Sequence, residues 1–150
     1  MKKRKFAVFD IDGTLYRSAF YIDVVEALID NSSFSVDYHA QTAQAKADWH
    51  NRAHHLAYRT YIDILISIWQ KHVHELDAST LENIAKDITK SKKGYVYTYT
   101  RELAKELKAK GYFMIALSGS FHEVVEPFAK HHGFDLIFGE ETVRKNGKLT

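Results

Sequence analysis

Two aspartates, separated by a single residue, stand at the end of the first apolar stretch of this sequence. Phe6 to Phe9 form the kind of apolar run that a fully buried strand needs, and Asp10 and Asp12 come directly after it. Because side chains alternate between the two faces of an extended chain, both carboxylates point to the same side. Two converging acids repel each other, so burying them requires a cation or hydrogen-bond donors. The pattern therefore indicates chemistry, the alternative being an acidic strand-to-loop edge that only faces solvent.

Phosphoryl transfer through an aspartyl phosphate is the reaction that fits such a pair. One carboxylate attacks phosphorus, and the other protonates the leaving oxygen. A hard dication, Mg2+, would relieve the repulsion and neutralise the phosphate. Gly13 permits a turn directly after the acids, and Thr14 adds a hydroxyl beside them.

The composition predicts one ordinary globular domain. Of the 150 residues, 45% are hydrophobic and 27% are charged, which is enough for a real core. The formal net charge of +2 gives no argument for nucleic-acid binding. The absence of cysteine suits a cytoplasmic protein, and no apolar run approaches the length of a membrane span. The basic residues Lys2 to Lys5 precede too short an apolar run for a signal peptide, so we interpret them as a solvated tail.

A long helical block follows the two acids. Helical patterns occur near residues 20–29, 37–55, 58–69 and 79–88, and a capping box from Ser79 to Glu82 opens the last of them. The block is too long for a loop, so we expect it to pack a small core of its own. We interpret its aromatic side chains as part of that core: Tyr21, Trp49, Tyr58, Tyr61 and Trp69.

Strands and helices alternate in the rest of the chain. We expect a helix over 97–110, a buried strand over 112–117, a helix to 132, a strand over 134–138 and a hairpin over 143–150. The hairpin turns at Asn146-Gly147, and Pro127 predicts a kink or a restart in the helix that contains it. This alternation indicates a parallel sheet with its ligand site beyond the carboxyl ends of the strands.

A turn rich in serine follows the second strand. Ser118, Gly119 and Ser120 offer hydroxyl and backbone N–H groups at a helix start, an arrangement that suits a phosphate oxygen. Since parallel strands end at one edge, we expect these groups to lie near Asp10 and Asp12.

The run Asp10-Ile11-Asp12-Gly13-Thr14-Leu15 matches DxDGT(L/V), the first motif of the haloacid dehalogenase superfamily. The run from Ala116 to Phe121, with the segment after it, is similar to the second motif of the phosphoserine-phosphatase-like branch, subfamily IB. The resemblance implies a Rossmann-like α/β core formed by residues 1–16 and 95–150, incomplete at its C-terminal end. It also implies that residues 17–94 are an inserted helical cap, which closes over the active site and selects the substrate.

The same resemblance implies a role for each residue of the two motifs. Asp10 would be the nucleophile, and Asp12 the general acid and later the base that activates water. The Asp10 carboxylate and the Asp12 main-chain carbonyl would bind Mg2+. Ser118 and the Gly119 N–H would hold phosphate oxygens, and Thr14 would support the loop. The implied substrate is a small phosphorylated metabolite.

The sequence departs from the family pattern in two respects. The lysine of the third motif and the acids of the fourth are not found in their expected context, so we expect the N-terminal part of such an enzyme, with weak Mg2+ binding and reduced turnover. The first strand would then be an exposed apolar edge, which predicts a dimer across that edge, a swapped hairpin or poor stability. The glutamate with which phosphoserine phosphatases read the serine ammonium has no counterpart in Tyr16 to Phe20, which argues against phosphoserine.

Two alternatives to an active phosphatase remain open. A catalytically impaired fragment or pseudoenzyme could act as a binding module, and phosphotransfer to an acceptor other than water cannot be separated from hydrolysis by sequence. Nine histidines also raise the question of a metal site. They lack the acidic partners and spacing of a zinc site, so we interpret them as surface or capping residues.

Overall fold

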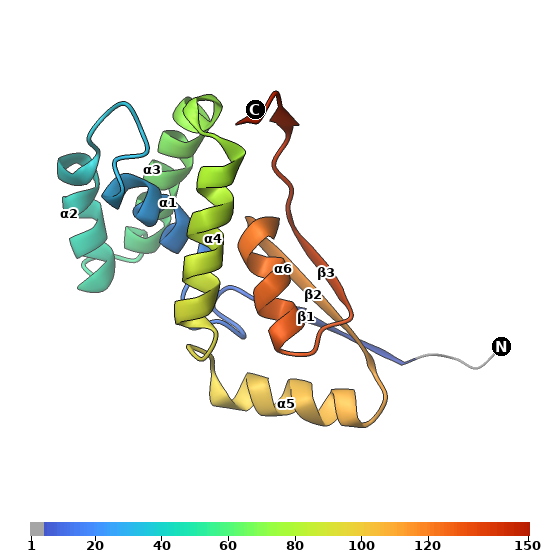
Figure 1. Cartoon of the computed structure of the whole chain (residues 1–150). Coiled ribbons are helices and arrows are strands. Elements are labelled where there is room, and N and C mark those ends of the chain that lie inside the picture. Colours follow the sequence, from blue (N-terminus) through green and yellow to red (C-terminus); the bar gives the residue numbers. More distant parts are fainter. Residues whose placement is uncertain (1–4) are drawn as a thin grey trace.

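The computed structural model describes residues 5–150, so the basic residues 2–4 of the expected tail lie outside the described range. Figure 1 shows a small sheet with helices beside it and a helical block at one end. The elements in chain order are β1 (Phe6–Asp10), α1 (Phe20–Asp30), α2 (His39–His50), α3 (Ala57–His72), the 3-10 turn η1 (Val73–Glu75), α4 (Ala78–Lys92), α5 (Thr98–Ala109), β2 (Phe113–Phe121), α6 (His122–His131), β3 (Leu136–Glu140), β4 (Arg144–Lys145) and β5 (Lys148–Leu149).

The main sheet has three parallel strands in the order β1-β2-β3. Asp10 at the end of β1 is in register with Leu117 of β2, and Leu117 is in register with Phe138 of β3. The carboxyl ends of all three strands therefore meet at one edge of the sheet. This confirms the prediction of a parallel sheet in an α/β fold.

The two faces of β1 differ in burial. Phe9 is buried and meets the ring of Phe134 edge-on at 5.6 Å. Phe6 and Val8 lie on the opposite face and are 63% and 49% exposed. The expectation of a fully buried first strand is therefore wrong, because in the described part of the chain β1 lies at the edge of the sheet and only one of its faces is covered. The edge position itself agrees with the sequence-based prediction.

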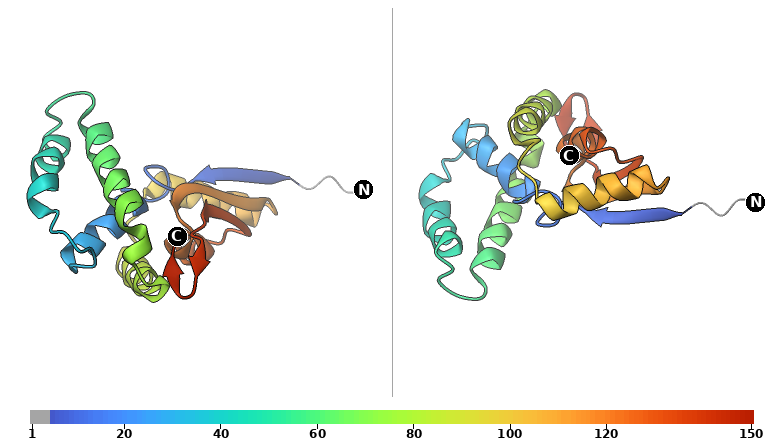
Figure 2. Two further views of the ribbon diagram at one scale, coloured as in Figure 1. Left: turned by 90° about the horizontal axis from the view of Figure 1, so that it is seen from above. Right: turned by 90° about the horizontal axis from the view of Figure 1, so that it is seen from below.

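The helical block projects from the end of the sheet opposite the N-terminus, with α2 and α3 outermost (Figure 2). Its apolar residues form one continuous cluster with those of the sheet and α6, so the expected separate core is not found. Phe20 of α1 stacks on Tyr16 at 3.9 Å and contacts Phe128 of α6 at 4.8 Å. α4 contacts both α1 and α6 and so connects the block to the sheet layer. The domain boundaries at residues 16 and 95 stay predictions.

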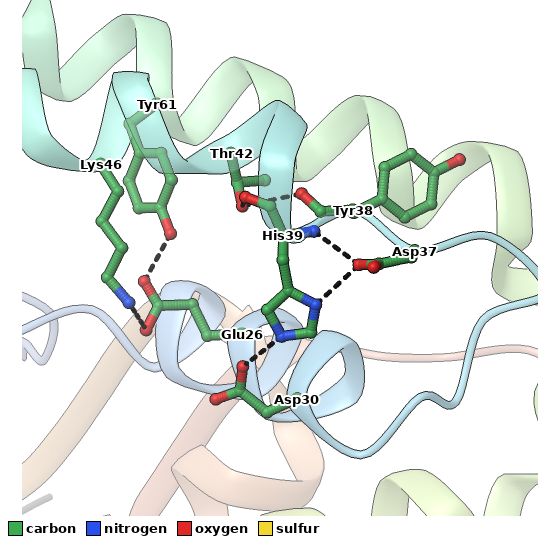
Figure 3. Close-up of polar contacts among 8 residues, drawn as sticks. All are labelled: Glu26, Asp30, Asp37, Tyr38, His39, Thr42, Lys46 and Tyr61. Atoms are coloured by element: carbon green, nitrogen blue, oxygen red, sulfur yellow. Dashed lines mark hydrogen bonds and ion pairs between the residues drawn. The ribbon is translucent and has the colours of Figure 1, made fainter.

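Polar contacts join α2 and α3 to α1 (Figure 3). Glu26 accepts a 2.5 Å hydrogen bond from the Tyr61 hydroxyl of α3 and pairs with Lys46 of α2 at 2.9 Å. His39, the first residue of α2, lies 2.7 Å from Asp37 and 3.1 Å from Asp30. These contacts position α3, which faces the carboxyl edge of the sheet.

The hairpin of β4 and β5 is confirmed, and its two turn residues, Asn146 and Gly147, have φ angles of 52° and 82°. The capping box before α4 is wrong: the helix begins at Ala78, and Asp77 is its N-cap residue. Ser79 therefore lies inside the helix and cannot be its N-cap, and Glu82 pairs with Arg144 of the hairpin.

Three further points concern the helices. α6 runs from His122 to His131 without interruption, so Pro127 does not restart it. His72 is only 4% exposed, so the interpretation of the histidines as surface residues is wrong there. None of the helices within residues 5–150 has the length and apolar character needed to cross a bilayer.

Candidate active site

The chain turns sharply directly after β1, and Asp10, the last residue of that strand, lies at the start of the turn. The carbonyl oxygen of the fully buried Ile11 accepts hydrogen bonds from three successive N–H groups, those of Thr14, Leu15 and Tyr16. Gly13 has a φ of +73°, which a residue with a Cβ adopts only under strain. The Thr14 hydroxyl donates a 2.6 Å hydrogen bond to Oδ2 of Asp10, whose side chain is otherwise exposed.

The carboxyl group of Asp12 is held by three donors from distant parts of the chain. Its Oδ2 accepts hydrogen bonds from Ser118 at 2.5 Å and Ser120 at 3.0 Å. Its Oδ1 accepts the N–H of Phe20, the first residue of α1, at 2.7 Å. Burial raises the pKa of Asp12, although these hydrogen bonds oppose the shift. A carboxyl group with a raised pKa, fixed in position, suits a general acid.

The segment Ser118-Gly119-Ser120 belongs to the end of β2 and not to the start of a helix. β2 extends to Phe121 through a register shift after Leu117, and α6 begins only at His122. The expectation that α6 directly offers its first N–H groups beside Ser118 is therefore wrong. Gly119 and Ser120 line the same cavity as the two aspartates, whereas Thr14 and Ser118 reach the site through their hydrogen bonds to Asp10 and Asp12.

Ser120 was not among the predicted site residues. It is 2% exposed, and its hydroxyl accepts the Tyr21 N–H at 2.8 Å while donating to Asp12. The signal was present in the sequence, because in an extended segment Ser120 lies on the same face as Ser118. Reading the segment as a helix start concealed it.

A cavity of about 390 Å³ lies over the two aspartates, between the sheet edge and the helical block. Its floor is formed by Asp10, Asp12, Gly119 and Ser120, and its opposite wall by side chains of α3 and α1. The wall and rim residues are Ala19, Tyr21, Tyr58, Ile62, Ile66, Trp69, Gln70 and Glu140.

Three aromatic residues that we expected inside the helical block line this cavity. Tyr58 is 45% exposed, and its pKa is raised by burial and by the negative charges of Asp12 and Asp10. Tyr21 and Trp69 are the other two. Trp49 and Tyr61 instead stack on each other at 5.5 Å within the block.

A larger cavity of about 590 Å³ lies between α5 and the end of α6, away from the acids. Its lining is basic, but its charges are partly compensated: Arg101 and Lys105 pair with Glu102, and Lys108 pairs with Asp135. We place the candidate site at the smaller cavity, because it contains the pair Asp10 and Asp12.

The donor set suits a hard cation held partly by other ligands. Within residues 5–150 there is no group of three or more histidine, cysteine or acidic side chains spaced for a metal ion. Mg2+, however, commonly takes only one or two protein carboxylates and keeps waters and substrate phosphate. The exposed Asp10 carboxylate meets this need. The carboxyl group of Asp12 is engaged by donors, which leaves its main-chain carbonyl as the expected ligand from that residue.

A three-stranded parallel sheet with a pair of aspartates at its carboxyl edge, beside a helical block, defines a Rossmann-like α/β protein with an acidic cavity at that edge. A model of the haloacid dehalogenase-like hydrolase family matches residues 7–150, and the chain belongs to that family. No curated protein matches the sequence significantly.

Solved structures show the same fold. A protein of unknown function from Bordetella pertussis Tohama I superposes with a TM-score of 0.70 at 12% identity, over 99% of this chain and 66% of that one. The phosphoserine phosphatase from T. onnurineus gives a TM-score of 0.53 at 25% identity, over 97% and 62%. A phospho-aspartyl intermediate analogue of phosphoserine phosphatase gives 0.54 at 22%, over 99% and 62%. The chain thus spans about two thirds or less of these structures.

Proposed function

We propose that this protein is a Mg2+-dependent phosphomonoester hydrolase that acts on a small phosphorylated metabolite through an aspartyl phosphate at Asp10. The observation that carries the proposal is the contrast between the two acids. Asp10 is exposed at the floor of the cavity, whereas Asp12 is half-buried and held by Ser118, Ser120 and the Phe20 N–H. This is the division of labour between a nucleophile and a proton donor.

The residues would act in two steps. An Asp10 oxygen bonds to phosphorus, the ester P–O bond breaks, and the leaving oxygen takes the proton of Asp12. The Asp12 carboxylate then takes a proton from water, whose oxygen attacks phosphorus and releases phosphate from Asp10. The Gly119 N–H would hold a phosphate oxygen, Ser118 would hold another when its hydroxyl turns from Asp12 to the substrate, and Thr14 orients Asp10. A bound Mg2+ would supply charge neutralisation of the phosphate.

A phosphate-release assay tests this function on the protein and on two variants. We expect Mg2+-dependent release from small phosphomonoesters that is lost in Asp10→Asn. The matched control is Asp87→Asn, which makes the same change on the exposed surface of α4. Activity that survives Asp10→Asn would contradict the proposed nucleophile.

A second candidate is a binding module without turnover, as a catalytically impaired fragment or pseudoenzyme. The observation in its favour is that no lysine or arginine is among the residues lining the cavity in the described part of the chain. Calorimetry with a phosphomonoester distinguishes the two, because a binding module would bind the ester and leave it intact.

The cellular location of this activity and the partners of the protein are also proposals. The lack of cysteine is compatible with a cytoplasmic location, and the small net charge favours neither nucleic acid nor a membrane surface as a partner.

A further inference from the structure

In the described part of the chain, the charged side chains that line the cavity are all negative. Asp10 and Asp12 lie at its floor, and Glu140 lies at its rim, at the carboxyl end of β3. No lysine, arginine or histidine is among the residues that line it in the described part of the chain. In the proposed reaction a phosphate group and its cation would lie near Asp10, which would leave Glu140 facing the part of the substrate that leaves.

Packing holds Glu140 in place beside the aromatic wall. It is in register with Phe121 of β2, whose ring stacks on Tyr21 at 4.9 Å and contacts Trp69 at 4.5 Å. The preceding residue, Gly139, lies so close to α6 that an added Cβ would be 2.7 Å from the Cα of His122. The end of β3 is thus pressed against the start of α6, which fixes where Glu140 projects.

The Glu140 carboxylate has no ion-pair or hydrogen-bond partner among residues 5–150 that would neutralise it. Its charge is nevertheless felt across the cavity, because it contributes, after burial, to raising the pKa of Tyr21. A carboxylate that lines the same cavity as tyrosine and tryptophan is a combination that attracts an organic cation, through charge and through the aromatic quadrupole. Glu140 would repel a carboxylate on the substrate. Such a carboxylate would also meet no positively charged side chain among the described residues that line the cavity.

Resting on the proposed function, we infer that the substrate is a phosphorylated amino alcohol, with its positively charged amine between Glu140 and the aromatic wall and with no carboxylate. The apolar side chains of Ile62 and Ile66 suit the short carbon chain that joins the two ends. Glu140 is therefore a specificity-determining residue and takes no part in the chemical step.

Three phosphate esters of similar size test this inference. 2-Aminoethyl phosphate carries the amine, n-propyl phosphate lacks it, and O-phosphoserine carries an amine and a carboxylate. We expect kcat/KM to be highest for 2-aminoethyl phosphate. In Glu140→Gln the ratio of kcat/KM between the amino and propyl esters should fall about tenfold, the effect of one charge-assisted contact. Glu141→Gln, the same change one residue further, should leave the ratio unchanged.

A binding measurement separates this inference from the proposed function. Calorimetry on the Asp10→Asn protein with Mg2+ should show tighter binding of 2-aminoethyl phosphate than of n-propyl phosphate, and Glu140→Gln should remove the difference. If no ester is hydrolysed but this preference holds, the proposed function fails and the inference stands. Equal affinity for the two esters, an unchanged ratio in Glu140→Gln, or a preference for O-phosphoserine would overturn it.

Discussion

The Ser120 hydroxyl donates a 3.0 Å hydrogen bond to Oδ2 of Asp12, although 108 residues separate them in the sequence. The same hydroxyl accepts the main-chain N–H of Tyr21 in α1, at 2.8 Å. One buried side chain thus links the candidate proton donor at the sheet edge to the start of α1. The position of Asp12 therefore depends on how α1 packs against the end of β2.

Replacing Ser120 by alanine should destabilise the fold. The Tyr21 N–H would lose its buried acceptor, which costs about 1–3 kcal/mol in the free energy of unfolding. Urea denaturation measures this change. Ser67→Ala is the matched control, because the Ser67 hydroxyl bonds to a main-chain carbonyl on the exposed face of α3. Equal free energies of unfolding for the two variants would show that the Ser120 hydrogen bonds do not stabilise the fold.

Two replacements of Asp12 should separate catalysis from stability. In Asp12→Asn the amide oxygen can accept the Phe20 N–H and the amide NH2 can donate to the Ser118 and Ser120 oxygens, and the change removes a partly buried charge. We therefore expect an unfolding free energy at neutral pH no lower than that of the parent. Phosphate release should nevertheless fall about 10²–10⁴-fold, the usual contribution of a general acid.

In Asp12→Ala both the free energy of unfolding and the rate of phosphate release should fall. The N–H of Phe20 and two serine hydroxyls lose their acceptor, and each loss costs about 1–3 kcal/mol. Thermal denaturation and phosphate-release assays on the pair measure this. An Asp12→Asn protein with full activity would contradict the assigned role of Asp12.

Acid should destabilise the helical block through Glu75. Its carboxylate accepts hydrogen bonds from Ser35 and lies 2.6 Å from Nδ1 of the buried His72, and the His72 contact does most to lower the pKa of Glu75 to about 2. The pKa of glutamate in the unfolded chain is about 4.3. Because the folded pKa is depressed, this stabilisation is present above the unfolded value and is lost as the pH falls from there toward 2.

Urea denaturation at several pH values between about 5 and 2 measures this loss. We expect the free energy of unfolding to vary less with pH in Glu75→Gln than in the parent or in Glu141→Gln. An unchanged pH dependence in Glu75→Gln would rule out the His72–Glu75 contact as its source.

The edge strand β1 should support self-association. β1 pairs only with β2 in the described part of the chain, and Phe6 and Val8 are 63% and 49% exposed. Unpaired strand edges with apolar side chains recruit another strand. We expect a dimer in sedimentation velocity that Val8→Lys shifts toward monomer.

Val36→Lys is the control for this change, because Val36 is equally exposed, at 48%, but lies in the loop between α1 and α2. A monomeric parent protein at all concentrations would contradict the predicted dimer.

Local patterns predicted the parts of the structure that local forces determine. The alternation of Asp10 and Asp12, the turn at Gly13 and the hairpin at Asn146-Gly147 each depend on a few neighbouring residues, and the structure has all three. The capping box failed because α4 begins at Ala78, before Ser79, and Glu82 pairs with Arg144, 62 residues away.

The rest of the site depends on contacts between distant segments. Ser120, Tyr58 and Glu140 reach the cavity only because β2, α3 and β3 meet at one edge of the sheet. Tyr58 and Tyr61 belong to the same helix and have the same side chain, yet one lines the cavity and the other bonds to Glu26. Which side of α3 faces the cavity depends on how the helix is rotated about its axis relative to the sheet. The helical period of the sequence does not specify this rotation.

The most direct test of the central claim is to trap the phosphoryl group on the protein. The protein is incubated with Mg2+ and a phosphomonoester, quenched in acid and digested, and the peptides are analysed by mass spectrometry. The account predicts the added mass of one phosphoryl group on the peptide that contains Asp10, and its absence in Asp10→Asn. Phosphate release without that adduct, or an adduct that persists in Asp10→Asn, would contradict it.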